Sequence, residues 1–111
     1  MPELWFSAAA RADLKSLFVE AAWEYPAIRG KLESGVRSRC DHLRLFPEFG
    51  RLRKEFHSSL PGLRSTVVAH LIIYYRVSVE PSQVEVLRVL DGRRDQTREL
   101  LGLDTESEAA P

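Results

Sequence analysis

The side chains of this 111-residue sequence that could do chemistry are mainly basic. Between positions 29 and 64 there are nine Arg or Lys residues against four Asp or Glu, although the whole chain carries 16 of each sign. Arg51, Arg53 and Lys54 lie close together in this region, and His57 and Arg64 follow. Guanidinium and ammonium groups bind phosphates and carboxylates, and an imidazole can accept a proton near neutral pH. The pattern indicates either a surface for an anionic partner or a solvated helix face.

Four of the arginines nearer the C-terminus are further candidates, namely Arg76, Arg88, Arg93 and Arg94. Arg76 and Arg88 are expected on neighbouring strands, where they could flank each other on an exposed sheet face with Glu85 as a partner. The run from Arg93 to Asp95 is expected to form a turn held by an arginine–carboxylate pair, with Asp95 capping a last helix. Ordinary ion pairing and partner binding both stay open for this group.

The sequence does not indicate a metal site, a disulfide framework or a membrane span. Cys40 is the one cysteine, and neither it nor the three histidines stand in a CxxC or HExxH spacing for zinc. Cys40 is in phase with Leu32, Val36 and Leu43, so we expect it to be buried. The longest apolar run, 67–75, is far below the ~20 residues of a membrane span, and the N-terminus is unlike a signal peptide. We therefore expect a cytoplasmic protein without metal, cofactor, small-molecule substrate or membrane contact.

The helices that must position these residues follow from hydrophobic periodicity. Residues 4–6 predict a short strand, and Ser7 can cap a helix over residues 8–24, where apolar side chains recur every three or four positions. Pro26 interrupts the chain and allows a second helix over residues 27–45, so the two helices should form an antiparallel hairpin. A loop follows, and we expect His42 at the surface, His70 in a turn, and Trp5 and Trp23 in the core or at a helix edge.

The second half of the sequence favours strands. Residues 47–62 hold Pro, Gly and Ser without a period and predict a loop, whereas β-branched and aromatic runs at 66–68, 72–77 and 84–90 predict strands. Residues 95–103 could add a turn or two of helix, and the acidic residues 104–111 are expected to be disordered. The order β-α-α-β-β-β predicts an α+β fold, a helical hairpin packed on a small antiparallel sheet, as one domain over residues 1–103.

With this order of elements, the sequence resembles the RelE/ParE superfamily of bacterial type II toxins, and more closely its ParE-like branch. The resemblance rests on an ordered set of short segments between positions 4 and 95. They are Phe6-Ser7, Ala12-Asp13-Leu14, Leu43, Phe46-Pro47-Glu48-Phe49-Gly50-Arg51, Leu63-Arg64-Ser65, Tyr74-Tyr75-Arg76-Val77, and the run from Val86 to Asp95. Many relatives carry His where this chain has Asp91.

The resemblance also implies which activity to expect. RelE-like members are ribosome-dependent endoribonucleases, and they need a base, an acid and phosphate-binding cations to cut messenger RNA. The positions that supply these groups fall on Leu60, Gly62, Ile72 and Leu100, and only Arg64 and Arg94 keep a matching cation. The resemblance therefore implies the ParE-like activity, which is inhibition of DNA gyrase by binding. It also implies a cognate antitoxin whose amphipathic segment lies on the toxin.

On this interpretation the basic residues are contacts to the target or the antitoxin, with no catalytic role assigned. The candidates are Arg51, Arg53, Lys54, Arg64, Arg76, Arg88, Arg93 and Arg94. One alternative is a ribosome-dependent mRNA endoribonuclease that uses the loop cations with His57 as its base. Another is an inactive relative that binds only its antitoxin or DNA.

Overall fold

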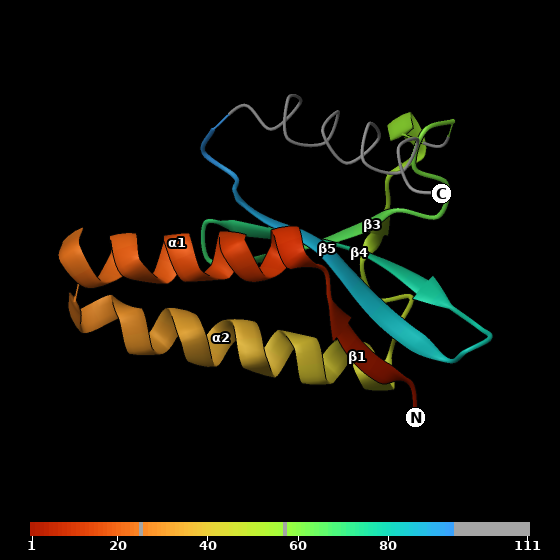
Figure 1. Ribbon diagram of the computed structural model, residues 1–111, viewed down its shortest axis with the longest axis horizontal. Helices are drawn as coiled ribbons and strands as arrows, with labels where there is room; N and C mark the ends of the chain where they lie inside the picture. Colours follow the sequence, from red (N-terminus) through yellow and green to blue (C-terminus); the bar gives the residue numbers. More distant parts are fainter. Residues whose placement is uncertain (25, 57, 95–111) are drawn as a thin grey trace.

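The computed structural model describes residues 1–24, 26–56 and 58–94, in which two long helices pack on a five-stranded sheet (Figure 1). The elements, in chain order, are β1 (Glu3–Phe6), α1 (Ala8–Glu24), α2 (Pro26–Leu45), β2 (Arg51–Leu52), a 3₁₀ turn (Lys54–Phe56), β3 (Arg64–Val68), β4 (Leu71–Ser78) and β5 (Gln83–Asp91). The predictions for His57, Asp95, Leu100, the helical turns at 95–103 and the acidic tail at 104–111 lie outside the described residues. The domain boundary at position 103 stays a prediction.

The two helices agree closely with the sequence-based prediction. Helix α1 begins after Ser7, whose Oγ accepts a hydrogen bond from the Ala10 amide at 3.0 Å, as an N-cap does. The same hydroxyl donates to the Leu87 carbonyl oxygen at 2.7 Å, so the cap also fastens α1 to β5. Helix α2 begins at Pro26, where a missing amide hydrogen leaves no intrahelical bond unmade. The two helices lie side by side along one face of the sheet (Figure 1).

The sheet has the order β1-β5-β4-β3-β2. Strands β3, β4 and β5 form the predicted antiparallel series, each two residues longer than the sequence indicated. Strand β1, however, pairs with β5 in parallel, with Phe6 opposite Val86, so the sheet is mixed and not wholly antiparallel. No turn joins β1 to β5, and side-chain alternation carries no information on strand direction. The two-residue strand β2 pairs with β3 in a segment predicted as loop.

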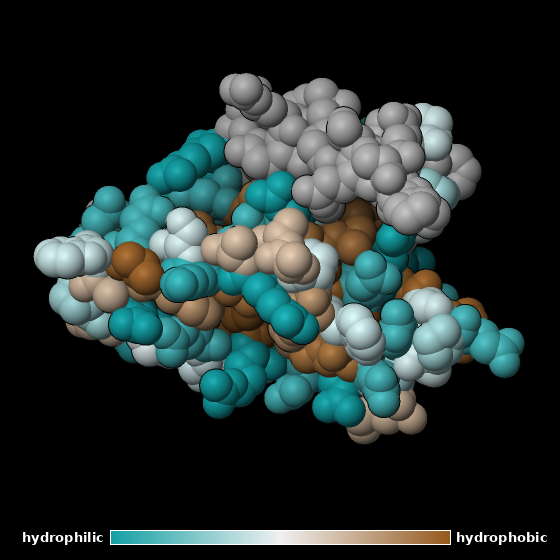
Figure 2. Space-filling model, viewed as in Figure 1, coloured by the Kyte–Doolittle hydropathy of each residue, from teal (hydrophilic) through white to brown (hydrophobic). Residues whose placement is uncertain are grey.

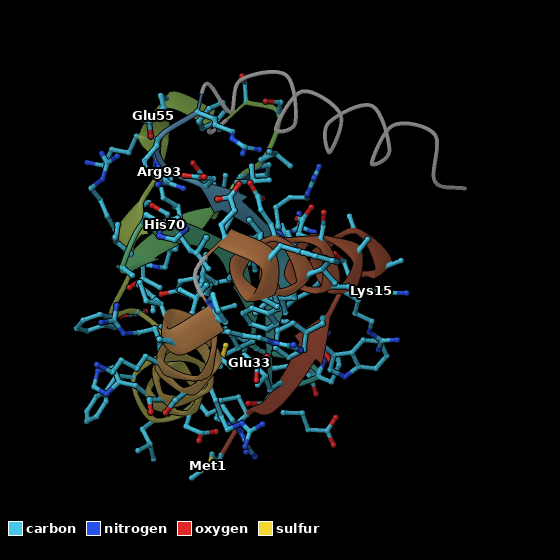
Figure 3. All side chains as sticks on the ribbon, turned by 90° about the vertical axis from the view of Figure 1, so that its left-hand side faces the viewer. Met1, Lys15, Glu33, Glu55, His70 and Arg93 are labelled. Carbon is cyan, nitrogen blue, oxygen red and sulfur yellow. The ribbon has the colours of Figure 1, made fainter. Side chains whose placement is uncertain are left out.

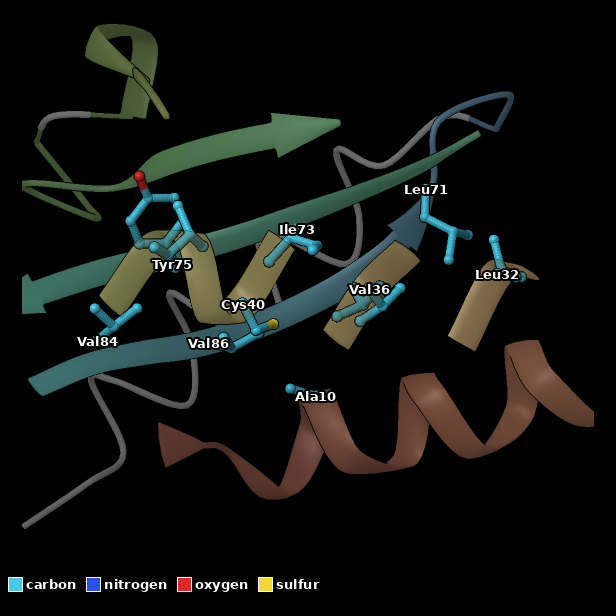
Figure 4. Packing of buried hydrophobic residues seen from close by; sticks show 11 residues of the cluster. Ala10, Leu32, Val36, Cys40, Leu71, Ile73, Tyr75, Val84 and Val86 are labelled. Atoms are coloured by element: carbon cyan, nitrogen blue, oxygen red, sulfur yellow. The ribbon is translucent and has the colours of Figure 1, made fainter. Parts of the chain in front are cut away.

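The main core lies between the helices and the sheet. The buried residues of this helix-side core are Ala10, Leu32, Val36, Cys40, Leu43, Leu71, Ile73, Tyr75, Val84, Val86 and Val89, most of which are drawn in Figure 4. The burial predicted for Cys40 is confirmed, and burial together with the charge of Asp41 raises the pKa of its thiol to about 11. Such a cysteine acts as a small apolar side chain, because the thiolate is the nucleophilic form.

A second apolar cluster lies on the other face of the sheet. Its buried members are Leu60, Leu63, Tyr74, Leu87 and Leu90, and the partly buried Phe56 and Ile72 pack against them. The loop between β2 and β3 contributes part of this cluster, so the central strands are covered on both faces, as their continuous apolar runs indicate. In Figure 2 the outer surface of the helices is mainly hydrophilic, and hydrophobic residues show mostly near the middle of the view.

Two aromatic predictions are wrong. Trp5 is 52% exposed at the edge strand β1, and Trp23 is 84% exposed near the end of α1. Neither residue packs in the core. Trp5 alternates along β1 with the partly buried Leu4 and Phe6, so its side chain faces outward. No helix in the described part of the chain is long and apolar enough to cross a membrane.

Candidate binding surfaces

The basic loop after α2 is held by one partly buried arginine. Arg53 donates from Nε to Glu55 at 2.9 Å and from Nη1 to the Ser65 hydroxyl at 3.1 Å. Its guanidinium also lies over the rings of Phe56 and Tyr74, 5.8 and 5.5 Å from their centroids. The hydrogen bond from Arg53 lowers the pKa of the Glu55 carboxyl below its usual value. Arg53 is therefore a structural residue, and only 16% of its side chain is exposed.

Arg51, Lys54 and Arg64 belong to the same end of the sheet as Arg53, through the chain or the β2–β3 pairing, and they differ in their ion pairing. Arg51 is mostly exposed and lies 3.9 Å from Glu55, a long surface ion pair of little strength. Arg64 donates to the carbonyl oxygens of Glu48 and Gly50, at 3.2 and 2.9 Å. Neither Lys54 nor Arg64 has a carboxylate within 4 Å among residues 1–24, 26–56 and 58–94.

Arg88 does not share an exposed face with Arg76. Its Nε and Nη2 donate to the two carboxylate oxygens of Asp13 on α1, both at 2.7 Å, and 18% of its side chain is exposed. A register shift at Tyr74 and Tyr75 accompanies this placement, and the Val89 amide also donates to Asp13. Arg76 lies opposite Glu85, at 3.9 Å, so the partner predicted for Arg76 is confirmed.

The turn after β5 is held by arginine–carboxylate pairs, as predicted, but Asp91 supplies the carboxylate. Arg93 donates to Asp91 at 2.9 and 3.0 Å, and Arg94 lies 3.7 Å from it. Arg94 also bonds to Glu20 on α1, at 3.0 Å. The hydrogen bonds from Arg93 hold the pKa of Asp91 down at about 2. Figure 3 shows Arg93 and His70 on the same side of the molecule, where His70 lies in the predicted turn between β3 and β4.

The candidate cations therefore do not form one cluster. Six of the eight have a carboxylate within 4 Å, and these are Arg51, Arg53, Arg76, Arg88, Arg93 and Arg94. β-Strand pairing brings Arg51, Arg53, Lys54 and Arg64 to the β2–β3 end of the sheet, whereas Arg93 and Arg94 pack toward α1. Pairing with carboxylates reduces the positive charge that most of these residues have available for an anionic partner.

A second surface, which the sequence analysis missed, lies at the C-terminal end of α2. Leu45, Phe46 and Phe49 are each more than half exposed, although they lie within five positions of one another. They border an open hollow of about 670 Å³, here called the Phe49 hollow, lined by His42, Leu45, Phe46, Pro47, Glu48, Phe49 and Val77. The sequence analysis named Phe46 and Phe49 only within a segment that resembles the RelE/ParE superfamily. The signal that could have predicted this surface is the presence of three large apolar residues where the helix ends and the loop begins.

Specific contacts fix the walls of the Phe49 hollow. The Tyr75 hydroxyl accepts a hydrogen bond from the Gly50 amide at 2.7 Å and donates to the Pro47 carbonyl oxygen at 2.8 Å. A side chain at Gly50 would meet the Tyr75 hydroxyl oxygen at 2.6 Å, so glycine is required there. His42 is half-buried and not fully at the surface, because its ring packs against Phe46 and Phe49 at 5.0 and 4.7 Å.

Comparison with known proteins decides the family. A family model described as the ParE toxin of the type II toxin–antitoxin system parDE matches residues 4–96. The chain belongs to the ParE toxin family. A solved structure entitled "Chromosomal ParDE TA system from P. aeruginosa" superposes with a TM-score of 0.65 at 20% identity, covering 82% of this chain and 96% of that one. This likeness shows the fold. No curated protein matches the chain.

Within this ParE-family fold, the positions that the resemblance assigned to RelE-like catalysis have structural roles. Leu60 is 1% exposed, and both it and Ile72 belong to the second apolar cluster. Gly62 has a φ of 80°, a backbone conformation that favours glycine over any residue with a side chain. Leucine, isoleucine and glycine at these three positions hold the β2–β3 loop against the sheet. They offer neither a proton donor nor a charge there.

Proposed function

We propose that this ParE-family chain inhibits growth by binding DNA gyrase in the cytoplasm, without cutting RNA, and that a cognate antitoxin neutralises it. The observation that carries the proposal is the packing of Leu60 and Ile72 in the second apolar cluster. A nuclease of the RelE type needs proton-transfer groups and cations where this chain has the packed hydrocarbon side chains of Leu60 and Ile72. The family match supports the toxin role, and the gyrase target comes from the resemblance to the ParE-like branch.

Purified components test the activity directly. We expect the full-length chain to inhibit DNA supercoiling by gyrase, and to leave messenger RNA intact in a translating extract. Adding the product of the neighbouring reading frame should restore supercoiling. Codon-internal cleavage of the message, with supercoiling unaffected, would instead support the endoribonuclease alternative. If the folded chain has no effect in either assay, the gyrase proposal is wrong.

The exposed cations of the β2–β3 end are the residues most available to gyrase. Arg51 is mostly exposed, and Lys54 has no carboxylate within 4 Å in the described part of the chain. We expect the double variant Arg51→Glu, Lys54→Glu to weaken gyrase inhibition by roughly tenfold, because reversed charges repel an acidic or DNA-bearing surface. The matched control is Lys15→Glu on the exposed side of α1, which should inhibit as the natural chain does. Equal inhibition by all three proteins would remove this loop from the gyrase contact.

A further inference from the structure

We infer that the Phe49 hollow is the docking site for an acidic amphipathic segment of the antitoxin, an assignment that rests on the proposed function. Leu45 and Phe46 are each 58% exposed, Phe49 is 53% exposed, and Val77 adds another partly exposed apolar side chain. Other exposed apolar residues, such as Trp23 and Val79, do not line the hollow. A hollow with several large apolar side chains in water is typical of a binding surface.

The hollow is formed before any partner arrives. Tyr75 ties the backbone at both Pro47 and Gly50, and its ring belongs to the helix-side core. On the other side, the Arg39 guanidinium lies over the Phe49 ring, 5.1 Å from its centroid, and donates to the Thr66 hydroxyl and the Val67 carbonyl oxygen. A surface fixed in this way needs little ordering when a partner binds, so more of the contact energy appears as affinity.

Charge around the hollow indicates the chemistry of the occupant. Seven of the twelve arginines among the described residues have a carboxylate within 4 Å, and Arg39 and Arg64 are among the five that do not. Both contact the walls of the hollow, Arg39 at Phe49 and Arg64 at the Glu48 carbonyl oxygen. Glu48 is the one acidic residue in the lining, so the two guanidinium groups leave a net positive charge beside the hollow. A segment with apolar side chains for the hollow and carboxylates beside them would match both features.

Binding of the full-length product of the neighbouring reading frame tests the assignment. We expect Phe46→Ser with Phe49→Ser to weaken its binding to this chain by roughly 100-fold, because buried aromatic side chains dominate interface energies. The matched control is Trp23→Ser, which removes an aromatic side chain that is 84% exposed on α1 and should leave the affinity unchanged. All three proteins should show the same circular dichroism spectrum, since the altered side chains are largely exposed.

Charge variants provide a second, milder test that leaves the aromatic walls in place. We expect Arg39→Gln to weaken binding by roughly tenfold and to reduce its dependence on salt concentration. Arg37→Gln is the control, because Arg37 is exposed on the same helix and does not line the hollow. If Arg39→Gln changes the thermal unfolding temperature, Arg39→Lys, which keeps the charge, should restore most of the affinity.

The outcomes separate this inference from the proposed function. If the neighbouring product binds the natural chain and both serine substitutions leave the affinity intact, the docking site is wrong and the proposed function stands. If it does not bind the natural chain, neutralisation by an antitoxin is wrong, and the docking site falls with it. If the serine variant loses gyrase inhibition but keeps its affinity for the neighbouring product, the hollow belongs to gyrase. A natural chain that dimerises, and a serine variant that does not, would assign the hollow to a second copy.

Discussion

Asp91 at the end of β5 shows how single residues hold the ends of the elements. Hydrogen bonds from Arg93 keep the pKa of Asp91 at about 2, below its ordinary value of 3.8. A carboxyl whose pKa is lower in the folded state stabilises the fold fully at pH values above its ordinary pKa. This stabilisation is lost as the pH falls through the pKa of the folded state. Arg93 and Arg94 are themselves well exposed, so solvent weakens both pairs.

We expect Asp91→Asn to lower the free energy of unfolding at pH 7 by about 1–2 kcal/mol. The natural chain should lose this part of its stability between about pH 4 and about pH 2, and the variant should show a shallower decline there. Urea unfolding at several pH values measures both effects. Parallel stability curves for the two proteins over that range would show that Asp91 is not ionised more readily in the folded state.

Tyr75 joins the core to the Phe49 hollow through its hydroxyl. Burial raises the pKa of this phenol, which therefore stays protonated and can donate to Pro47 while accepting from Gly50. We expect Tyr75→Phe to lower the free energy of unfolding by about 1–3 kcal/mol, because it leaves a buried amide without its partner. It should also weaken antitoxin binding, although the aromatic ring remains. Unchanged stability in chemical denaturation would contradict this role.

Single residues were predicted unevenly from the sequence. Cys40 was correctly placed in the core, because its spacing from Leu32 and Val36 repeats at helical intervals. Arg88 was misplaced, because the register shift that lets it reach Asp13 leaves no mark on the pattern of apolar residues. The two tryptophans were also misplaced, since size and apolarity alone do not say on which side of an element a residue lies.

At the scale of elements, the best supported link is the cap that joins α1 to the sheet. Ser7 accepts from the Ala10 amide and donates to Leu87 on β5, so one hydroxyl serves a helix and a strand. We expect Ser7→Ala to lower the free energy of unfolding by about 1–2 kcal/mol. Ser16→Ala, at an exposed position within α1, is the control and should be neutral or slightly stabilising. Thermal unfolding measures both, and equal destabilisation would remove the special role of Ser7.

Helices were more predictable than strand pairing. Regular apolar spacing, Ser7 and Pro26 locate both helix starts within one residue. Pairing depends on contacts between distant segments, so the parallel position of β1 beside β5 could not be derived from the order of elements. Strand β2 has two exposed residues, too few to show alternation, and its partner β3 alone defines it.

For the whole molecule, we propose that this ParE-family chain acts through binding surfaces and does not cut RNA. The basic candidates were found from composition, but the neutralisation of most of them depends on acids from other elements, such as Asp13 and Glu20 on α1. The Phe49 hollow was missed because it forms only when segments distant in the sequence come together. Residues from α2, the following turn and β4 meet there.

Brief expression in growing bacteria, followed by mapping of both transcript ends and DNA breaks, tests this claim most directly. We expect DNA breaks with an SOS response, and transcripts that are not cut within codons. Transcripts cut within codons, together with loss of the cutting when Arg64 or His57 is replaced, would contradict the claim.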